Sequence, residues 1–187
     1  SYAPLGTLLL EINDDPYIND YSRELDLNNA IAKVKTTSSE NVIEREYLVS
    51  NPDKIYAIHL VSKKACVFGY TIKFESLLKF ETQIGSNNIR VQGYAPVKAD
   101  PSYLQKNRNA IVFDSKRGTR FSTIINIQNS NGKITKTDST LSLSEATEAT
   151  IFVSMATSFN GFDKDPVTKG ANHAAIANNI LSDAKQL

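Results

Sequence analysis

The stretch CVFGYTIKF, residues 66–74, alternates between apolar side chains and small or polar ones, with one exception at Val67. Successive side chains of a β-strand point to opposite faces of a sheet, so this period of two predicts a strand. The side chains expected to face the interior together are those of Cys66, Phe68, Tyr70, Ile72 and Phe74. The stretch therefore indicates a sheet that covers an apolar core with one of its faces.

Strand patterns recur on both sides of this stretch. They cover residues 4–12, 41–50, 55–61, 88–96, 110–114, 119–128 and 148–157, and two strands each within 21–37 and 133–144. Within 41–50, the side chains of Ile43, Arg45, Tyr47 and Val49 share one face. Segments 55–61 and 148–157 are apolar at most positions, which is typical of strands covered on both faces. Residues 97–109 are irregular and long enough to form a functional loop.

The hydrophobic period changes only at the C-terminal end. Between Asn172 and Leu187, a helical spacing relates Ala175, Ile176, Asn179, Ile180 and Ala184. This spacing predicts one helix after many strands. The fold class is therefore expected to be all-β, as a large antiparallel β-sandwich with one C-terminal α-helix.

Composition narrows the classes of partner. The 187 residues are 41% hydrophobic, and 21 basic residues against 20 acidic ones give a net charge of +1. Nucleic acids and anionic membranes attract concentrated basic patches, so we expect neither as a partner. No apolar run approaches the roughly 20 residues of a membrane-spanning helix. The single cysteine, Cys66, cannot form an internal disulfide, and it leaves the cellular compartment undetermined.

The residues that usually carry chemistry are sparse. His59 lies in an apolar run and is expected to be a hydrogen-bonded core residue, whereas His173 is expected to be solvated or to cap the helix. We find no zinc-ligand spacing, nucleophile motif or phosphate-binding loop, and we predict no catalytic residue, metal or cofactor. The run DKDP, residues 163–166, lacks the later ligands of a calcium loop and is better explained as a turn.

One polar loop carries two aromatic residues. The run TSFNGFDKDP, residues 157–166, comes after an apolar strand and contains Phe159 and Phe162 among Ser, Asn, Gly and Asp. A loop that only reversed the chain would not need two phenylalanines. The residues alone indicate a β-sandwich with a binding or accessory role.

Several segments together resemble a known family. They are YAPLGTLLLEI (2–12), YSRELDLNNAIAKVKTT (21–37), REYLVSNPDKIYAIHLVS (45–62), VQGYAPVKADPSY (91–103), FDSKRGTRFSTIINI (113–127) and ATEATIFVSMATSFNGFDKDPVTKG (146–170). In this order they resemble the amino-terminal β domain of glycoside hydrolase family 95, which contains α-L-fucosidases and some α-L-galactosidases. The resemblance implies a sandwich of the supersandwich type, and residues 157–166 are its most specific part.

The resemblance also implies a longer parent protein. Residues 1–170 would form the β domain without the family's opening segment, and residues 171–187 a helix leading to a linker and an (α/α)6 catalytic barrel. The chain begins at Ser1 without an initiator methionine, as expected for a piece of such a protein. The family's catalytic acid and base lie in the barrel, so this chain alone is expected to be inactive. Its expected partners are that barrel and, through the parent, a fucosylated glycan. The parent is expected to be secreted, to the periplasm or the cell exterior.

The same resemblance selects a candidate site. The loop expected to contact substrate or the barrel contains Thr157, Ser158, Phe159, Asn160, Phe162 and Asp163. The two phenylalanines would anchor it, either by packing under the loop or against the barrel. Asn160, Gly161 and Asp163 would shape the turn and cap the next segment of the chain. The family often has a histidine where this chain has Lys98 or Ala99, so no sugar contact is carried over to those positions.

Two other functions remain open at this point. A stand-alone carbohydrate-binding module would present aromatic platforms, which an exposed coplanar pair of tyrosines could supply in a chain with 8 Tyr and no Trp. A structural or adhesion protein would use the sandwich for assembly only.

Overall fold

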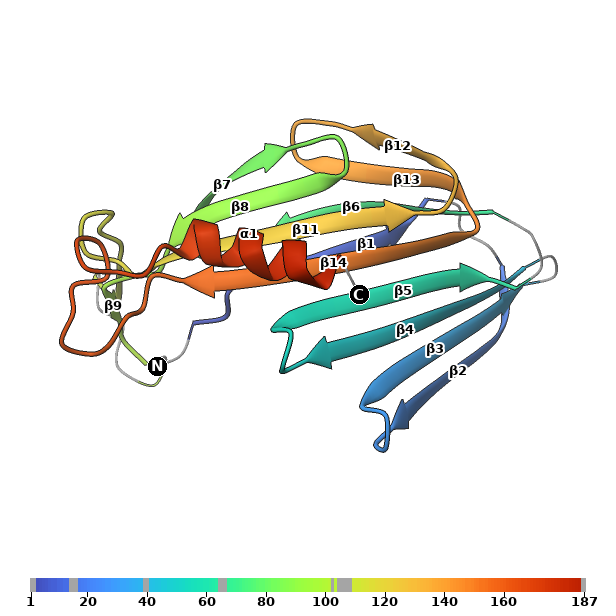
Figure 1. The fold of residues 1–187 in the computed structure, drawn as a ribbon, viewed down its shortest axis with the longest axis horizontal. Helices are drawn as coiled ribbons and strands as arrows, with labels where there is room; N and C mark the ends of the chain where they lie inside the picture. Colours follow the sequence, from blue (N-terminus) through green and yellow to red (C-terminus); the bar gives the residue numbers. More distant parts are fainter. Residues whose placement is uncertain are drawn as a thin grey trace.

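The computed structural model describes residues 3–13, 17–38, 41–63, 67–101, 103 and 109–185. These residues contain fourteen β-strands and one C-terminal α-helix (Figure 1). The predicted all-β fold class, with antiparallel sheets and one helix, is confirmed. Cys66, and most of the central part of the long loop at 97–109, lie outside the described residues.

The larger sheet has eight strands, all antiparallel to their neighbours. In spatial order they are β2 (Ile18–Asp26), β3 (Ile31–Ser38), β4 (Val42–Ser50), β5 (Ile55–Ser62), β14 (Glu148–Thr157), β11 (Arg120–Asn129), β8 (Asn88–Tyr94) and β7 (Lys79–Ile84). Strand β14 is central, because it pairs with β5 on one side and with β11 on the other.

The smaller sheet has four strands and packs on the first. Its order is β1 (Thr7–Ile12), β6 (Phe68–Glu75), β13 (Thr140–Ala146) and β12 (Lys133–Lys136). Strands β9 (Lys98–Ala99) and β10 (Ile111–Val112) form a separate hairpin-like pair.

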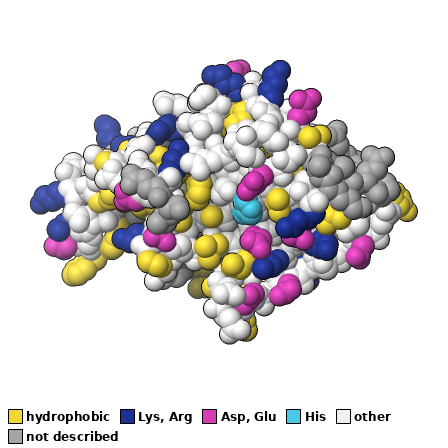
Figure 2. Space-filling model, turned by 45° about the vertical axis from the view of Figure 1, so that its right-hand side comes forward, with side chains coloured by type: hydrophobic (Ala, Val, Ile, Leu, Met, Phe, Trp, Pro, Cys, Tyr) yellow, Lys and Arg dark blue, Asp and Glu magenta, His cyan; other side chains and the backbone are white. Residues whose placement is uncertain are grey.

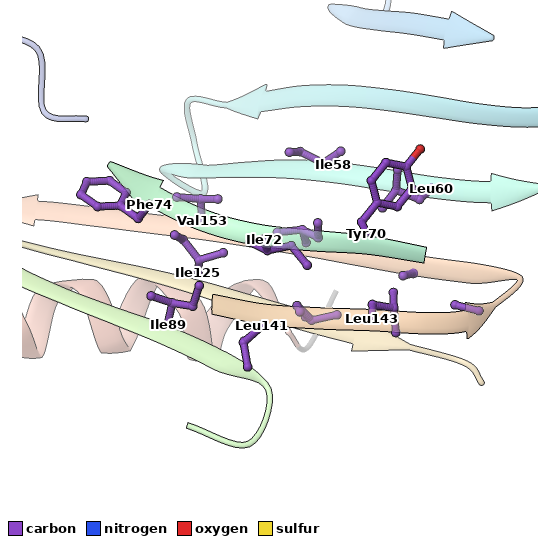
Figure 3. Packing of buried hydrophobic residues seen from close by; sticks show 14 of the residues in the cluster. Ile58, Leu60, Tyr70, Ile72, Phe74, Ile89, Ile125, Leu141, Leu143 and Val153 are labelled. Atoms are coloured by element: carbon purple, nitrogen blue, oxygen red, sulfur yellow. The ribbon is translucent and has the colours of Figure 1, made fainter. Parts of the chain in front are cut away.

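The core lies between the two sheets. Figure 3 shows side chains of β6 and β13 in one cluster with residues of the larger sheet, namely Ile58, Leu60, Tyr70, Ile72, Phe74, Ile89, Ile125, Leu141, Leu143 and Val153. Phe68, Tyr70, Ile72 and Phe74 are each no more than 7% exposed. The inward face predicted for residues 66–74 is therefore confirmed for the four side chains that the structure describes.

Strands β5 and β14 differ in how well they match the prediction of two covered faces. In β14, Val153 faces the core, while Phe152 packs on the opposite face against a second cluster that contains Ile124. In β5, Leu60 is buried in the core, but the His59 side chain on the other face is 37% exposed. His59 is hydrogen-bonded to Thr150, as expected, but it is not a core residue.

Helix α1 (His173–Ala184) packs across β11 and β14 on the outer face of the larger sheet (Figure 1). The predicted helix is confirmed, and Ala184 of its predicted face is buried. Ala175, Ile176 and Asn179 are exposed, so the rest of the buried face is displaced by about one residue, or roughly 100° of rotation. The residues buried against the sheet are Ala177, Leu181 and Ala184, whereas Ile176 is 40% exposed. The small side chain of Ala177 allows close approach to the sheet, and it lies between the exposed Ile176 and the half-buried Asn178, so counting apolar positions does not find this face.

The surface is consistent with a nearly neutral chain. On the face seen in Figure 2, acidic and basic side chains are interspersed. Among the described residues, no helix is long and apolar enough to cross a membrane.

Candidate functional site

The predicted loop joins β14 to α1. It lies at the same end of the molecule as β9 (Figure 1). Thr157 is the exposed last residue of β14, and the helix begins after Asn172, whose side chain accepts a hydrogen bond from the Ala175 amide at 3.1 Å. The loop therefore has a fixed strand on one side and a capped helix on the other.

Ser158 fixes the start of the loop. It is 2% exposed, and its Oγ accepts a hydrogen bond from the Arg120 amide at 2.9 Å. Its own amide donates to the Arg120 carbonyl at 2.9 Å, and its carbonyl accepts from the Ala171 amide at 3.0 Å. Within this chain, Ser158 therefore has a structural role at the base of the loop.

The turn after Ser158 depends on two predicted residues and on one that sequence reasoning missed. Asn160 donates from Nδ2 to the Lys169 carbonyl at 3.0 Å, and Gly161 has a left-handed φ of +113°. Asp165, rather than Asp163, accepts the hydrogen bonds of the turn, from the amides of Val167 (2.9 Å) and Thr168 (2.7 Å) and from the Thr168 hydroxyl (3.0 Å). The bonds from Thr168 and then Val167 lower the pKa of the Asp165 carboxyl. The Asp-Pro pair was the available signal for this turn.

Both phenylalanine rings of the loop are exposed. Phe159 is 63% exposed and Phe162 is 98% exposed. They do not pack under the loop, which removes one of the two anchoring alternatives. Neighbouring large apolar side chains that are exposed to solvent on one loop are typical of an interaction surface.

An open groove of about 410 Å³ lies beside the start of α1. Among the described residues, it is lined by Lys79, Phe80, Glu81, Gln92, Gly93, Tyr94, Arg120 and His173. Strands β7, β8 and β11 and the helix each contribute to it. The backbone of Arg120 also holds Ser158, so the groove and the loop share one support. The lining offers cationic donors, an amide, a phenol and a carboxylate, which together can hydrogen-bond a polyhydroxylated ligand.

His173 lies at the helix end of the groove. Its Nδ1 is 2.7 Å from the Ser122 hydroxyl, and the side chain is half-buried. Burial, and to a lesser extent the nearby charge of Arg120, lowers the pKa of His173. The residue is thus neither the helix cap nor fully solvated, since Asn172 supplies the cap.

Lowering the pH is expected to destabilise the folded chain through His173. Its folded-state pKa lies below the unfolded value of about 6.5, so the unfolded chain takes up the proton first as the pH falls. The stabilisation is therefore complete above about pH 6.5 and is lost as the pH falls toward the folded-state pKa. Thermal unfolding of the wild type and of His173→Gln, from about pH 7.5 to about pH 5, isolates this contribution. An identical pH dependence in both proteins would contradict it.

Comparison with known proteins places this fold in a class. The family model for the N-terminal domain of glycosyl hydrolase family 65 matches residues 1–161. The chain belongs to this family of glycoside hydrolase N-terminal domains.

Individual relatives are much longer than this chain. Alpha-L-fucosidase 2 of Arabidopsis thaliana is 29% identical over 194 residues, which cover 99% of this chain and 23% of the plant protein. A solved structure titled "Putative kojibiose phosphorylase from human microbiome" matches with a TM-score of 0.55 and 12% identity, over 96% of this chain and 25% of its own. At this identity the second likeness concerns the fold alone. The chain spans about a quarter of the length of each of these two proteins.

Proposed function

We propose that this chain is the non-catalytic amino-terminal β domain of a longer glycoside hydrolase, and that this enzyme is an α-L-fucosidase of the family-95 type. The observation that carries the proposal is the 29% identity to a plant α-L-fucosidase over nearly the whole chain. The resemblance of residues 157–166 to the family-95 β domain supports the same assignment.

The carboxylates of this chain support a non-catalytic role. Hydrolysis of a glycosidic bond needs two carboxyl groups facing each other across the scissile bond. Among the described residues lining the groove, Glu81 is the only acid. Glu44 and Glu46, on the outer face of the larger sheet, each form ion pairs with lysines, such as Lys63 at 3.1 Å and Lys33 at 3.1 Å. In this proposal the catalytic pair lies in the barrel of the longer protein.

The aromatic residues favour an accessory domain over a stand-alone carbohydrate-binding module. Such a module presents flat aromatic platforms to sugar rings. Among the described residues, none of the three aromatic pairs is the coplanar pair of exposed tyrosines that such a module could use, since all three are edge-to-face with interplanar angles of 63°, 85° and 80°.

In this proposal the loop at 157–163 meets the catalytic barrel. Phe159 and Phe162 insert their exposed rings into that interface, and the adjoining groove lies where the glycan enters. The fixed hydrogen bonds of Ser158 and Asn160 hold the rings in place before docking, which lowers the entropy lost on association.

Replacing both rings with serine is expected to separate folding from docking. In the isolated chain, Phe159→Ser with Phe162→Ser should change the melting temperature little, because exposed side chains contribute little to stability. Affinity for a separately supplied barrel should fall about tenfold or more, as for central apolar residues of an interface. Leu77→Ser is a matched control, because Leu77 is 88% exposed and lies outside the loop. An unfolded double variant, or one with unchanged affinity, would contradict the docking role.

The proposed enzyme class is tested with the longer protein that contains this chain. We expect it to hydrolyse an aryl α-L-fucoside, with release of the aryl group monitored by absorbance. If the protein cleaved only an aryl α-L-galactoside, the assignment to a family-95 type of glycoside hydrolase would stand, but the proposed specificity for fucose would be wrong. Failure to cleave any glycoside would overturn the proposal.

A further inference from the structure

The outer face of the larger sheet carries a polar surface between helix α1 and the edge strand β7. In Figure 1, β8 and β7 lie beside the helix, on the side away from β5. The groove described above adjoins a smaller recess of about 50 Å³ here, because Glu81 and Gln92 line both of them. We call the groove and this recess together the outer groove.

Strand register sets the floor of the outer groove. Side chains of β7, β8 and β11 that point away from the core stand opposite one another in rows, of which two are Lys79–Tyr94–Arg120 and Glu81–Gln92–Ser122. The recess continues this floor with Gln83 and Arg90, which are also register partners. The floor is therefore a set of polar and charged side chains on adjacent strands.

Three permanent cations line the outer groove, against one carboxylate, that of Glu81. The cations are Lys79, Arg90 and Arg120. Within the described chain none of the three forms an ion pair, whereas Lys33 and Lys35, on the same face of the sheet, each pair with a glutamate. The excess positive charge of the outer groove is therefore not neutralised by the described part of this chain.

The two arginines are positioned by neutral partners. Arg90 donates from Nη1 to Oδ1 of Asn178 at 2.9 Å, and Arg120 donates from Nη2 to the Ser115 carbonyl at 2.9 Å. A guanidinium group has five N–H donors, so one such bond orients it and leaves other donors available. Each arginine can therefore still bind an oxyanion.

The wider end of the outer groove has a positive potential. Nζ of Lys79 lies 5.7 Å from the centroid of the Phe113 ring, a contact that leaves its charge intact. Besides burial, the charge of Arg120 lowers the pKa of His173 at the helix side of the groove. An anion bound at this end would be attracted by both permanent cations.

Neutral hydrogen-bonding groups lie between the cations. The side chains of Gln83 and Gln92 form no hydrogen bond within the described chain. Each amide has donors and an acceptor, and Tyr94 adds a phenol. Sugar hydroxyls both donate and accept hydrogen bonds, so they can satisfy these groups together. The combination of cations and free amides on one floor therefore suits a glycan better than a simple anion.

We propose that the outer groove binds a glycan that carries anionic groups, either sulfate esters or the carboxylates of uronic acids. The planar guanidinium groups of Arg90 and Arg120 suit both, because such oxyanions accept two parallel N–H bonds from one arginine. The choice of a glycan rests on the proposed function, which makes this chain part of a glycoside hydrolase. The choice of an anionic glycan rests on the unpaired cations and goes beyond that function, since fucose is uncharged.

Isothermal titration calorimetry of this chain tests the proposal with four probes at about 50 mM salt. The probes are a sulfated fucose oligosaccharide, a uronic acid oligosaccharide, a neutral fucose oligosaccharide of equal length, and inorganic sulfate. We expect one or both anionic oligosaccharides to bind at least about tenfold more tightly than the neutral one and than inorganic sulfate. Their affinity should fall at about 300 mM salt, because salt screens charge interactions. The tighter of the two identifies the anionic group.

Two variants should change this affinity in opposite directions. Lys79→Gln combined with Arg120→Gln should lower it about tenfold or more, because two charged donors are lost. Glu81→Gln removes the one acid and should raise it about twofold to fivefold, an increase that loss of folding cannot produce. Arg23→Gln is the matched control and should leave the affinity unchanged, because Arg23 is exposed on β2, outside the outer groove.

Several results would overturn the proposal. Equal binding of neutral and anionic oligosaccharides would remove the charge preference, and equally tight binding of inorganic sulfate would indicate a simple anion site. Unchanged affinity in both groove variants would place the binding elsewhere. Binding by this chain but not by the longer protein would mean that other polypeptide covers the groove.

The proposed function can fail separately. If the anionic glycan binds as expected but the longer protein cleaves no glycoside, the proposed enzyme class fails and the binding proposal stands. If the longer protein cleaves an aryl α-L-fucoside but neither protein prefers an anionic glycan, the binding proposal fails and the enzyme class stands.

Discussion

Replacing Phe68 with alanine is expected to lower the free energy of unfolding by about 3–5 kcal/mol, as for other large-to-small substitutions of buried aromatic residues. Phe68 is 4% exposed and lies in β6, the strand of the smaller sheet that pairs with both β1 and β13. Its ring meets Tyr70 edge-on at 5.7 Å between centroids, so the substitution removes this contact and leaves a cavity beside it.

Urea unfolding of the wild type and the variant measures this loss directly. Leu77→Ala is a suitable control, because Leu77 is 88% exposed and the cost should stay within about 0.5 kcal/mol. A cost below about 1 kcal/mol for Phe68→Ala would mean that the core at β6 is not closely packed around this ring.

The isolated chain is expected to hydrolyse aryl α-L-fucosides no faster than buffer. General acid–base catalysis alone accelerates such reactions about 10²- to 10⁴-fold. The described groove has one carboxylate where the reaction needs two, so this acceleration should be absent.

The measurement is the release of the aryl group at high protein concentration over a long incubation. A Glu81→Gln variant is the matched control, because it removes the groove's one acid and should give the same background as the wild type. Turnover by the wild type that survives repurification and is lost in Glu81→Gln would show that this chain has a catalytic site of its own.

The strands that could be predicted from the sequence are those whose two faces differ in polarity. Residues 68–74 alternate so regularly that both the strand and its buried face can be read from them. The alternation in β4 likewise places Tyr47 and Val49 on one face, and the register agrees. It cannot show whether that face is covered, which is why the exposure of Val49 was not predicted.

The helix and the groove show why other features could not be predicted. The helix buries Ala177 and Leu181 beside polar residues with partners on the sheet, such as Asn178, which accepts a hydrogen bond from Arg90 at 2.9 Å. Such partners lie about 90 residues away in the chain. The groove could not be predicted for the same reason: its residues are far apart in the sequence. Lys79, Arg120 and His173 come together only through the order of the strands and the position of the helix.

The two phenylalanines identify the candidate loop in the sequence. The hydrogen bonds that shape the loop cannot be read from the sequence. The exposure of both rings results from a turn that Asp165 and Gly161 shape and that directs them into solvent. A docking role for the rings remains a proposal.

The central position of β14 has a consequence for how the chain folds during its synthesis. Strands β2 to β5 form one meander and β7, β8 and β11 belong to another part of the sheet, and only β14 joins them. In the smaller sheet, β6 pairs with the earlier strand β1, but its second partner, β13, follows much later in the chain. Both sheets are therefore incomplete until residues 140–157 have been synthesised, and until then the earlier strands have unpaired edges. Such non-local topologies fold slowly, and their unpaired strand edges favour aggregation while the sheets are incomplete.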